Sequence, residues 1–279
     1  MEENSVNKSV VIFLLSICVI SLALGIFANY RLIVISRENQ QQKEKKKDNN
    51  KNIVQGVEEV TDVTDEATLE FVKKRQIVLK NYTTDQLTFK KSRIYEKDQS
   101  NKDLSEEGKL LSVLYTLYEN DKNYEELDKN MYPNITPNRD GATYVINPDV
   151  VRELYTNTYG GELDVNTSIP EEVKRNFYYN KEYNVYVINT GFGGNCADGS
   201  LTYDYKFMED SANVYVYSAH VYYKNCPYEV YKDFDKKEKY EAGESLEINE
   251  SNYQDFYNYK VTYKKDGSNY VFEAIEKIK

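Results

Sequence analysis

The sequence predicts an α+β protein, in which an N-terminal transmembrane helix precedes helices packed on a curved antiparallel sheet of cone or half-roll type. Three observations support this fold class. One uncharged and mostly apolar run, residues 10–30, lies near the N-terminus and does not recur. Apolar residues repeat at three- and four-residue spacing in several segments before residue 160, and at two-residue spacing after residue 177. Helices that precede the strands, instead of alternating with them, are typical of α+β domains.

The apolar run has the length of a membrane span. Its 21 residues at ~1.5 Å each reach ~31 Å, which matches the hydrocarbon core of a bilayer. In lipid, a helix satisfies every backbone polar group of such a segment. We therefore predict a short tail over residues 1–9, a transmembrane anchor in contact with membrane lipid over residues 10–35, a charged linker without apolar residues over residues 36–52, and a soluble domain over residues 53–279.

The nature and direction of the anchor leave alternatives open. A cleaved signal peptide is one, because residues 26–28 resemble a small-residue cleavage site, although the run is long for a signal peptide. Lys8 precedes the span, whereas Arg31, Arg37 and the lysines of residues 43–47 follow it, and this bias favours a cytoplasmic domain. A large domain translocates largely regardless of charge. We predict a single-pass protein of the cell membrane with its domain outside the cytoplasm, and a cytoplasmic domain is the alternative.

The composition limits the partners. Residues 53–279 hold 28 Lys and Arg against 41 Asp and Glu, a formal charge of −13. So acidic a domain repels phosphate backbones, and we expect no nucleic-acid partner. The chain has 28 Tyr and no Trp, and tyrosine suits half-buried sheet surfaces, where its ring packs and its hydroxyl stays wet.

Two helices are expected first in the soluble domain. Approximate three- and four-residue apolar spacing predicts one over residues 53–80. The pattern of residues 104–120 predicts the second, with Asp103 and Glu106 as its capping box.

A compact strand–helix signature follows. Residues 142–146 form a short apolar strand pattern, Asn147 can cap a helix, and Pro148 suits its first position. Gly160 then ends this helix, and a further helical turn is expected from Pro170.

Alternating apolar residues predict an antiparallel meander in the last third of the chain. We expect residues 256–264 and 270–278 to form its firmest hairpin, around a turn at Asp266 and Gly267. The other expected strands are residues 183–188, 201–208, 214–223 and 228–231. The residues expected to share a face are Tyr257, Tyr259, Val261 and Tyr263 on one strand of the hairpin, and Tyr270, Phe272 and Ala274 on the other.

Two of the three cysteines are expected to form a disulfide. Cys18 lies in the span, which leaves Cys196 and Cys226. Strands 201–208 and 214–223 form a hairpin centred near residue 211, so facing residues have numbers that sum to about 422, as 196 and 226 do. Two unrelated cysteines are the alternative. The bridge would fasten a glycine-rich loop that is a possible ligand-contacting loop, formed by Gly191, Phe192, Gly193 and Gly194.

Catalytic and metal signals are weak. His220 is the sole histidine, and we expect it to be a packed or half-exposed strand residue and not a catalytic base. Asp233, Asp235 and Glu238 resemble the start of a calcium loop, but the glycine and the terminal glutamate of that loop are not in place and lysines interleave. We therefore predict no catalytic residue, no cofactor and no metal site.

The order of these elements, helix, helix, short strand, helix and antiparallel meander, resembles the cone-shaped nuclear-transport-factor-two-like and cystatin-like folds. With its short tail and single span, the chain is also similar to the inner-membrane scaffold subunits of type IV secretion machines. It further resembles single-pass anchored proteins of low-GC Gram-positive bacteria that are themselves uncharacterised. The resemblance covers residues 53–279 and rests on element order, so it transfers no functional residue.

These observations favour a membrane-anchored binding or scaffolding module without catalytic activity, with a possible protein partner in a membrane assembly. One alternative is a hydrolase or isomerase that uses carboxylates and tyrosines in a cone-shaped pocket. Another is a cytoplasm-facing regulatory domain. Folds of this type carry both enzymes and scaffolds, so the fold alone does not decide among them.

Overall fold

The computed structural model divides the chain into two compact units, Met1–Val57 and Glu58–Lys279, and the residues it describes belong to the second unit. The predicted anchor over residues 10–35 and the predicted linker over residues 36–52 lie outside the described residues. Among the described residues, no helix combines the length and the apolar character needed to cross a membrane. The described residues are 60–83, 93–139, 141–164, 166–167, 169, 173–174, 176–190, 198–225, 228–240 and 246–278.

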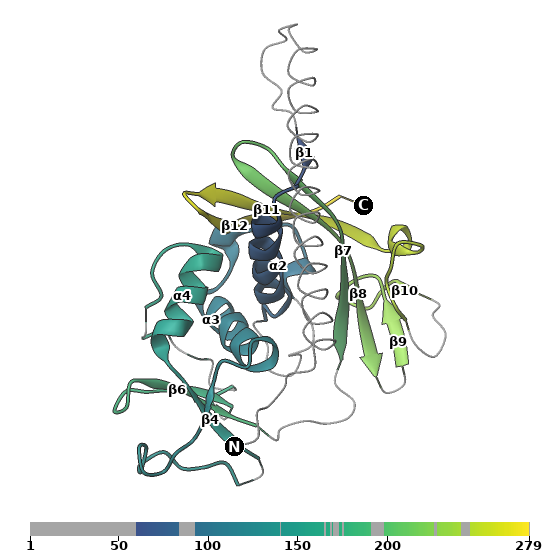
Figure 1. Cartoon of the computed structure of the whole chain (residues 1–279). Helices are drawn as coiled ribbons and strands as arrows, with labels where there is room; N and C mark the ends of the chain where they lie inside the picture. The colour runs from purple at the N-terminus through teal and green to yellow at the C-terminus, as the bar shows by residue number, and fades with distance from the viewer. Residues whose placement is uncertain are drawn as a thin grey trace, which may run out of the picture. The chain divides into compact units, whose positions relative to one another are not determined.

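The larger of two sheets is an antiparallel meander of β7, β8, β11 and β12, as the two-residue periodicity predicted (Figure 1). The short strands β1 and β2 pair with its outer strands, and the hairpin of β9 and β10 extends the far end of β8. The bounds are β1 Thr61–Asp62, β2 Gln99–Ser100, β7 Gly199–Glu209, β8 Asn213–Asn225, β9 Tyr228–Tyr231, β10 Lys239–Tyr240, β11 Tyr257–Asp266 and β12 Asn269–Lys277.

The predicted register of the β7–β8 hairpin is confirmed near its open end. Gly199 faces Tyr223 and Asp204 faces Ser218, and both pairs have numbers that sum to 422. A bulge at Tyr205 then shifts the pairing by one residue. A bulge bends a strand and increases its twist, so the closed end of the hairpin turns away from the open end.

The sequence predicted one sheet, and the structure has two. Strands β3, β4, β6 and β5 form a separate antiparallel sheet in that order. The strand expected over residues 142–146 is β4, and the strand expected over residues 183–188 is β6, but they pair with each other and not with the meander. The bounds are β3 Glu125–Glu126, β4 Thr143–Ile146, β5 Phe177–Asn180 and β6 Val185–Asn189.

Three α-helices pack next to one another, and α2 and α4 contact β12 of the larger sheet (Figure 1). Each begins at a side chain that accepts a backbone N–H of its first turn, Asp65 for α2, Ser105 for α3 and Asn147 for α4. The helices are α2 Glu66–Lys80, α3 Glu106–Tyr115, which continues as a π-helical turn Thr116–Asn120, and α4 Pro148–Tyr159, and the short 3₁₀ turns are Arg93–Tyr95, Asn101–Asp103 and Tyr253–Asp255.

The sequence predicted the ends of one helix correctly and the starts of the other two incorrectly. The cap, first residue and terminal glycine predicted for α4 are confirmed, and Gly160 has φ +70°, which favours glycine. The capping box predicted at Asp103 and Glu106 is wrong. Asp103 instead forms a capping box with Ser100 at the preceding 3₁₀ turn, and the Ser105 side chain caps α3. The first predicted helix begins at Glu66 and not near residue 53, since β1 precedes it.

One hydrophobic core joins the three helices to both sheets. It includes Val72 of α2, Leu114 of α3 and Val216 and Val261 of the larger sheet, all fully buried. The smaller sheet enters the same core, and Phe177 packs edge-on against Tyr115 of α3 with ring centroids 4.8 Å apart. The face of the larger sheet that meets the helices is therefore filled by side chains.

The faces predicted for the β11–β12 hairpin hold for one strand only. Tyr259, Val261 and Tyr263 of β11 are buried on the helix-covered face, as predicted. In β12 the register shifts between Phe272 and Ala274, so Glu273 is an extra residue. After such a bulge the alternation of faces reverses, and Ile275, not Ala274, enters the core.

Candidate binding site

The site residues predicted from the sequence are not described by the structure. Cys196 and Cys226 lie outside the described residues, and so does the glycine-rich loop of Gly191, Phe192, Gly193 and Gly194. The disulfide and the ligand loop therefore stay predictions. The described residues contain two other places where polar side chains gather, one buried and one open.

The buried place is a hydrogen-bonded cluster between α2 and the larger sheet. The Gln76 amide donates to Asp204 Oδ1 and to Ser218 Oγ, both at 3.2 Å. The Tyr263 hydroxyl donates to Gln76 Oε1 at 2.7 Å, and Lys80 forms an ion pair with Asp204 at 2.7 Å. Gln76, Ser218 and Tyr263 are fully buried, so these bonds offset the cost of removing the polar groups from water.

His220 belongs to the same buried region. Its Nδ1 lies 2.7 Å from Thr202 Oγ1, and its ring stacks on Tyr95 with centroids 4.2 Å apart. Its Nε2 has no hydrogen-bond partner in the described part of the chain. Burial holds the pKa of His220 well below its ordinary value, and the Lys80 charge adds to this. The prediction that His220 is a packed strand residue is confirmed.

This cluster serves stability. His220, Ser218, Gln76 and Tyr95 have no exposed surface, and the ion pair of Lys80 and Asp204 at the edge of the cluster is partly exposed. The signal that could have found the cluster is the placement of Ser218 and His220 at inward positions of β8, between valines and a buried tyrosine. Polar residues at core positions require partners, but the sequence does not name them.

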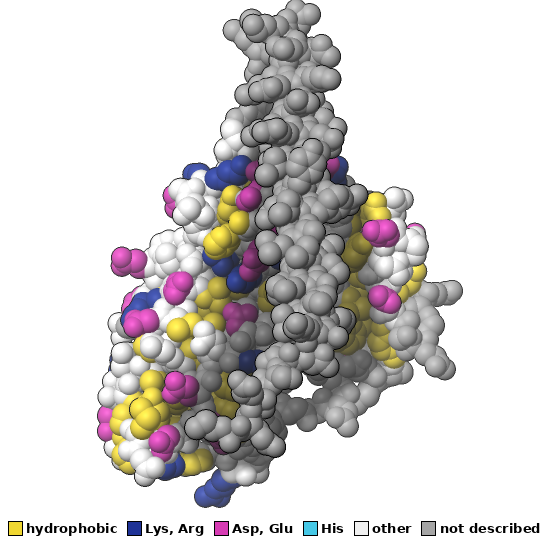
Figure 2. Space-filling view, in the orientation of Figure 1, with side chains coloured by type: hydrophobic (Ala, Val, Ile, Leu, Met, Phe, Trp, Pro, Cys, Tyr) yellow, Lys and Arg dark blue, Asp and Glu magenta, His cyan; other side chains and the backbone are white. Residues whose placement is uncertain are grey.

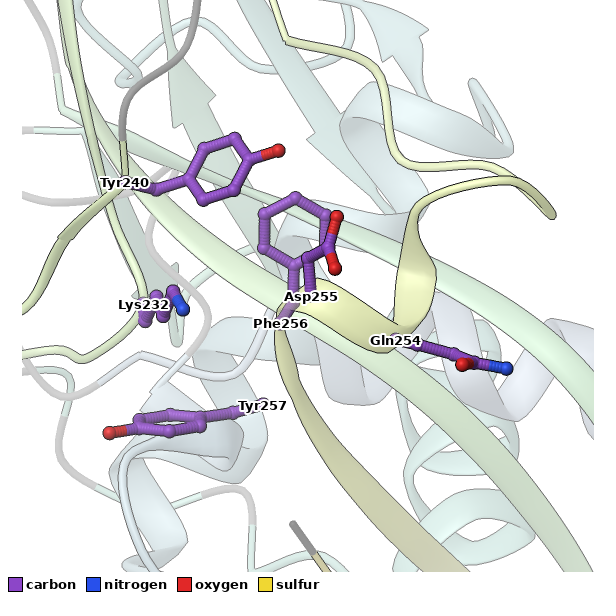
Figure 3. A pocket seen from close by; sticks show the side chains of 6 residues that line it. All are labelled: Lys232, Tyr240, Gln254, Asp255, Phe256 and Tyr257. Carbon is purple, nitrogen blue, oxygen red and sulfur yellow. The ribbon is translucent and has the colours of Figure 1, made fainter.

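The open place consists of two neighbouring pockets that share Tyr257 of β11. The larger has a volume of about 470 Å³ and the smaller about 240 Å³. Figure 3 shows the larger pocket, with the rings of Tyr240 and Tyr257 on either side of Lys232, and Gln254 pointing away from them. The other residues that line the larger pocket are Asp255 and Phe256, and those that line the smaller are Glu96, Asp233, Phe234, Asp235, Lys237, Glu238, Tyr257, Tyr259 and Lys277.

The loop between β9 and β10 builds one wall of the smaller pocket. The Asp233 carboxylate accepts the backbone N–H of Lys237 at 3.0 Å and that of Glu238 at 2.6 Å. The tight turn also uses Lys236, whose φ is +60°. Asp235 forms an ion pair with Lys237 at 2.8 Å. Two of the three carboxylates that resemble the start of a calcium loop, Asp233 and Asp235, thus hold their own loop together.

Aromatic contacts fix the same loop onto the sheet. Phe234 meets Tyr222 of β8 edge-on, with ring centroids 5.3 Å apart. The Arg93 guanidinium lies 4.5 Å from the centroid of the Phe234 ring, and it also forms an ion pair with Glu96 at 3.0 Å. A cation over an aromatic face is attracted by the ring quadrupole, so the pocket wall already contains one such pair.

The opposite wall comes from the final hairpin. The Lys277 ammonium lies 2.9 Å from the centroid of the Tyr257 ring, and the Tyr257 hydroxyl donates to Glu238. This hydrogen bond raises the pKa of Tyr257 to about 12. Removal from water lowers the pKa of Lys277, and the nearby carboxylates of Glu238 and Asp233 oppose that shift.

Tyr259 forms part of the floor of the smaller pocket. Its side chain lines the pocket, yet the residue is only 3% exposed. Its hydroxyl makes no hydrogen bond to another described residue, and burial raises its pKa. A phenol in this position can donate or accept one hydrogen bond from a group inside the pocket.

The chemistry of the smaller pocket favours a cation. Its lining holds four carboxylates and two ammonium groups, a formal charge of −2, together with three aromatic rings. Across the described residues, no three His, Cys, Asp or Glu side chains are arranged to hold a metal ion. Elsewhere the charges are mixed, and Figure 2 shows acidic and basic side chains interspersed on the face in view.

Comparison of the chain with models of known protein families, with curated proteins and with solved structures finds no match in any of the three.

Proposed function

We propose that this protein is a single-pass, membrane-anchored binding or scaffolding module whose domain lies outside the cytoplasm. The anchor is the uncharged run of residues 10–30, which has the length and composition of a span. The disulfide between Cys196 and Cys226 belongs to the same proposal, because disulfides persist on the oxidising side of a membrane.

The observation that carries the binding role is the filled interior of the domain. An enzyme of the cone-shaped type would use a chamber between helices and sheet. In this chain that space is occupied by packed side chains, including Leu79, Leu114, Val216 and Val261, each with at most 1% exposure. The two pockets described above instead lie at one end of the larger sheet and open to solvent.

The carboxylates give further support. A general acid at neutral pH needs a raised pKa, as a buried carboxyl would have. Hydrogen bonds from Thr68 lower the pKa of Asp65, and hydrogen bonds from Ser100 lower that of Asp103. At Glu106, burial raises the pKa, but hydrogen bonds from Lys109 and Tyr155 outweigh it and leave the pKa low.

The cone or half-roll form of the fold is also part of the proposal. The bulges at Tyr205 and Glu273 support it, since bulges curve a sheet around the helices that it carries. The resemblance to nuclear-transport-factor-two-like and cystatin-like domains, and to scaffold subunits of type IV secretion machines, is proposed on the same element order.

Thiol labelling of the full-length chain in intact cells tests this function. Lys264 is exposed on β11 and has no ion pair or side-chain hydrogen bond to another described residue, so Lys264→Cys leaves the fold unchanged. We expect a membrane-impermeant maleimide to label this variant from outside, above the level of the unsubstituted chain. The protein should also sediment with membranes. Labelling only after lysis would place the domain inside, and full-length protein in the detergent-free aqueous fraction would exclude the anchor.

A further inference from the structure

We propose that the smaller pocket binds a basic side chain of a protein partner, and that it prefers arginine to lysine. This inference rests on the proposed binding function and names the ligand chemistry of that function. Its basis is one juxtaposition, in which three aromatic residues, Tyr259 among them, and four carboxylates line a cavity of about 240 Å³.

The size of the pocket suits one side chain. Sites for drug-sized ligands occupy roughly 300–1,000 Å³, whereas this pocket holds about 240 Å³. The larger pocket adjoins it across Tyr257, with about 470 Å³ and the rings of Tyr240 and Phe256, which pack 4.7 Å apart. Residues that flank the basic side chain in an extended segment can occupy this second space. The ligand is therefore part of a polypeptide and not a free amine.

Two rings of the pocket lining already take part in cation–π contacts with the protein's own side chains. Lys277 lies over Tyr257, and Arg93 lies over Phe234. These are cation–π contacts, and guanidinium groups stack on aromatic faces better than ammonium groups do. The formal charge of −2 on the lining, and of −13 on residues 53–279, attracts a basic segment and repels an acidic one.

Tyr259 provides the second, independent observation. The residue is 3% exposed, and a phenol hydroxyl can donate or accept a hydrogen bond. Tyr259 lines the smaller pocket, and its hydroxyl makes no hydrogen bond to another described residue. A guanidinium seated against the rings carries five N–H donors, and one of them can donate to this hydroxyl while others reach a carboxylate of the lining.

The test uses the full-length chain in lipid nanodiscs and fluorescence anisotropy with short labelled peptides. One peptide carries a single arginine between apolar residues, and two others carry lysine or uncharged citrulline in its place. Unlabelled arginine amide serves as the free-cation competitor. We expect the arginine peptide to bind about tenfold more tightly than the citrulline peptide, with lysine in between, because one desolvated cation–π and ionic contact is worth about a factor of ten.

Two matched pairs of variants locate the binding. Glu238→Gln removes one charge from the pocket but keeps an acceptor for Tyr257, whereas Glu273→Gln removes the same charge from the exposed bulge of β12. Tyr259→Phe deletes only the hydroxyl, and Tyr217→Phe makes the same change on the other face of the larger sheet. We expect the pocket variant of each pair to weaken binding of the arginine peptide about threefold or more, and the control to leave it unchanged. Thermal unfolding of each variant should match the parent.

The outcomes decide separately between this inference and the proposed function. Equal binding of the arginine and citrulline peptides, or equal effects within the two matched pairs, would overturn the pocket assignment. Competition by arginine amide as strong as by the peptide would overturn the polypeptide ligand. Neither result affects membrane sedimentation or thiol labelling from outside, on which the proposed function stands or falls.

Discussion

His220 is a buried base whose Nε2 has no hydrogen-bond partner among the described residues. Its imidazole is held between Thr202 and the ring of Tyr95, and none of its surface is exposed. Protonation would place a positive charge in a space from which water is excluded, and the cation of Lys80 adds to the penalty. The stability of the domain therefore depends on the protonation of this one side chain.

We predict that His220 makes the free energy of unfolding fall in mild acid. The folded state keeps the imidazole neutral, whereas the unfolded chain titrates near pH 6.5. Below about pH 6.5 the unfolded state binds a proton that the folded state does not, so the free energy of unfolding falls by about 1.4 kcal/mol per pH unit until the folded pKa is reached. Above about pH 6.5 the contribution is absent.

Denaturant unfolding between about pH 5 and 7.5 measures this effect, with His220→Phe as the reference. Phenylalanine keeps the stack on Tyr95 and has no titrating group. Carboxylates titrate equally in both proteins, so the difference in slope isolates His220. Identical slopes in the parent and the variant would refute the prediction.

At this scale the sequence predicted the environment of His220 but not its neighbours. A histidine inside an apolar alternating strand is expected to be packed. Gln76 and Asp204 are 128 positions apart in the chain, and no local pattern announces such a pair. The same holds for the smaller pocket. Its acidic loop was visible as a run of carboxylates, but Tyr259, Glu96 and Lys277 join it only through the tertiary fold.

Among the secondary-structure elements, those with local signals were predicted and those with distant partners were not. The α4 helix carries its cap, its proline and its terminal glycine within its own sequence. Strand β4 is equally visible in the sequence. Its partner β6, however, follows about 40 residues later in the chain, after α4. Bulges are harder still. The one at Glu273 reverses the face of every later residue of β12, and the sequence gives no sign of it.

The β7–β8 hairpin carries the prediction of a disulfide. In the described part of this hairpin, the numbers of facing residues sum to 422 as far as the pair of Gly199 and Tyr223. Three residues further along the sequence on each side are Cys196 and Cys226. A disulfide that closes a loop of about 30 residues stabilises a protein by roughly 3–4 kcal/mol on the loop-entropy model.

Peptide mass mapping without reductant, on protein from the native membrane, should recover Cys196 and Cys226 in one linked fragment. Reduction should separate the fragment and lower the melting temperature. The double variant Cys196→Ser, Cys226→Ser should melt like the reduced protein, and should not change further when reductant is added. Recovery of both thiols free would contradict the pairing, and with it one argument for a domain outside the cytoplasm.

For the whole domain, the shared core couples two sheets that have no strand pairing with each other. Ile188 of β6 and Phe177 of β5 lie in the same buried cluster as Val216 and Val261 of the larger sheet. Helix α3 contributes Leu114 and Tyr115 to the same cluster. Neither sheet buries this face alone, so we expect them to unfold together.

We predict that Ile188→Ala destabilises both sheets by the same amount. Ile188 is 1% exposed, and deleting such a side chain costs about 2–5 kcal/mol through lost transfer energy and a residual cavity. Hydrogen exchange with mass spectrometry on the full-length chain in nanodiscs measures the loss in each sheet. Glu125→Ala, on the exposed edge strand β3, is the control and should change protection little.

Equal loss of protection in β6 and in the β7–β8 hairpin would show that opening one sheet opens the other. Faster exchange confined to the smaller sheet would mean that the two sheets are separate folding units, which the common core does not allow. Because the pockets lie at the end of the larger sheet, the coupled outcome has a consequence for binding. Ligand bound there would stabilise the smaller sheet as well, by the same linkage that lets a core substitution in one sheet weaken the other.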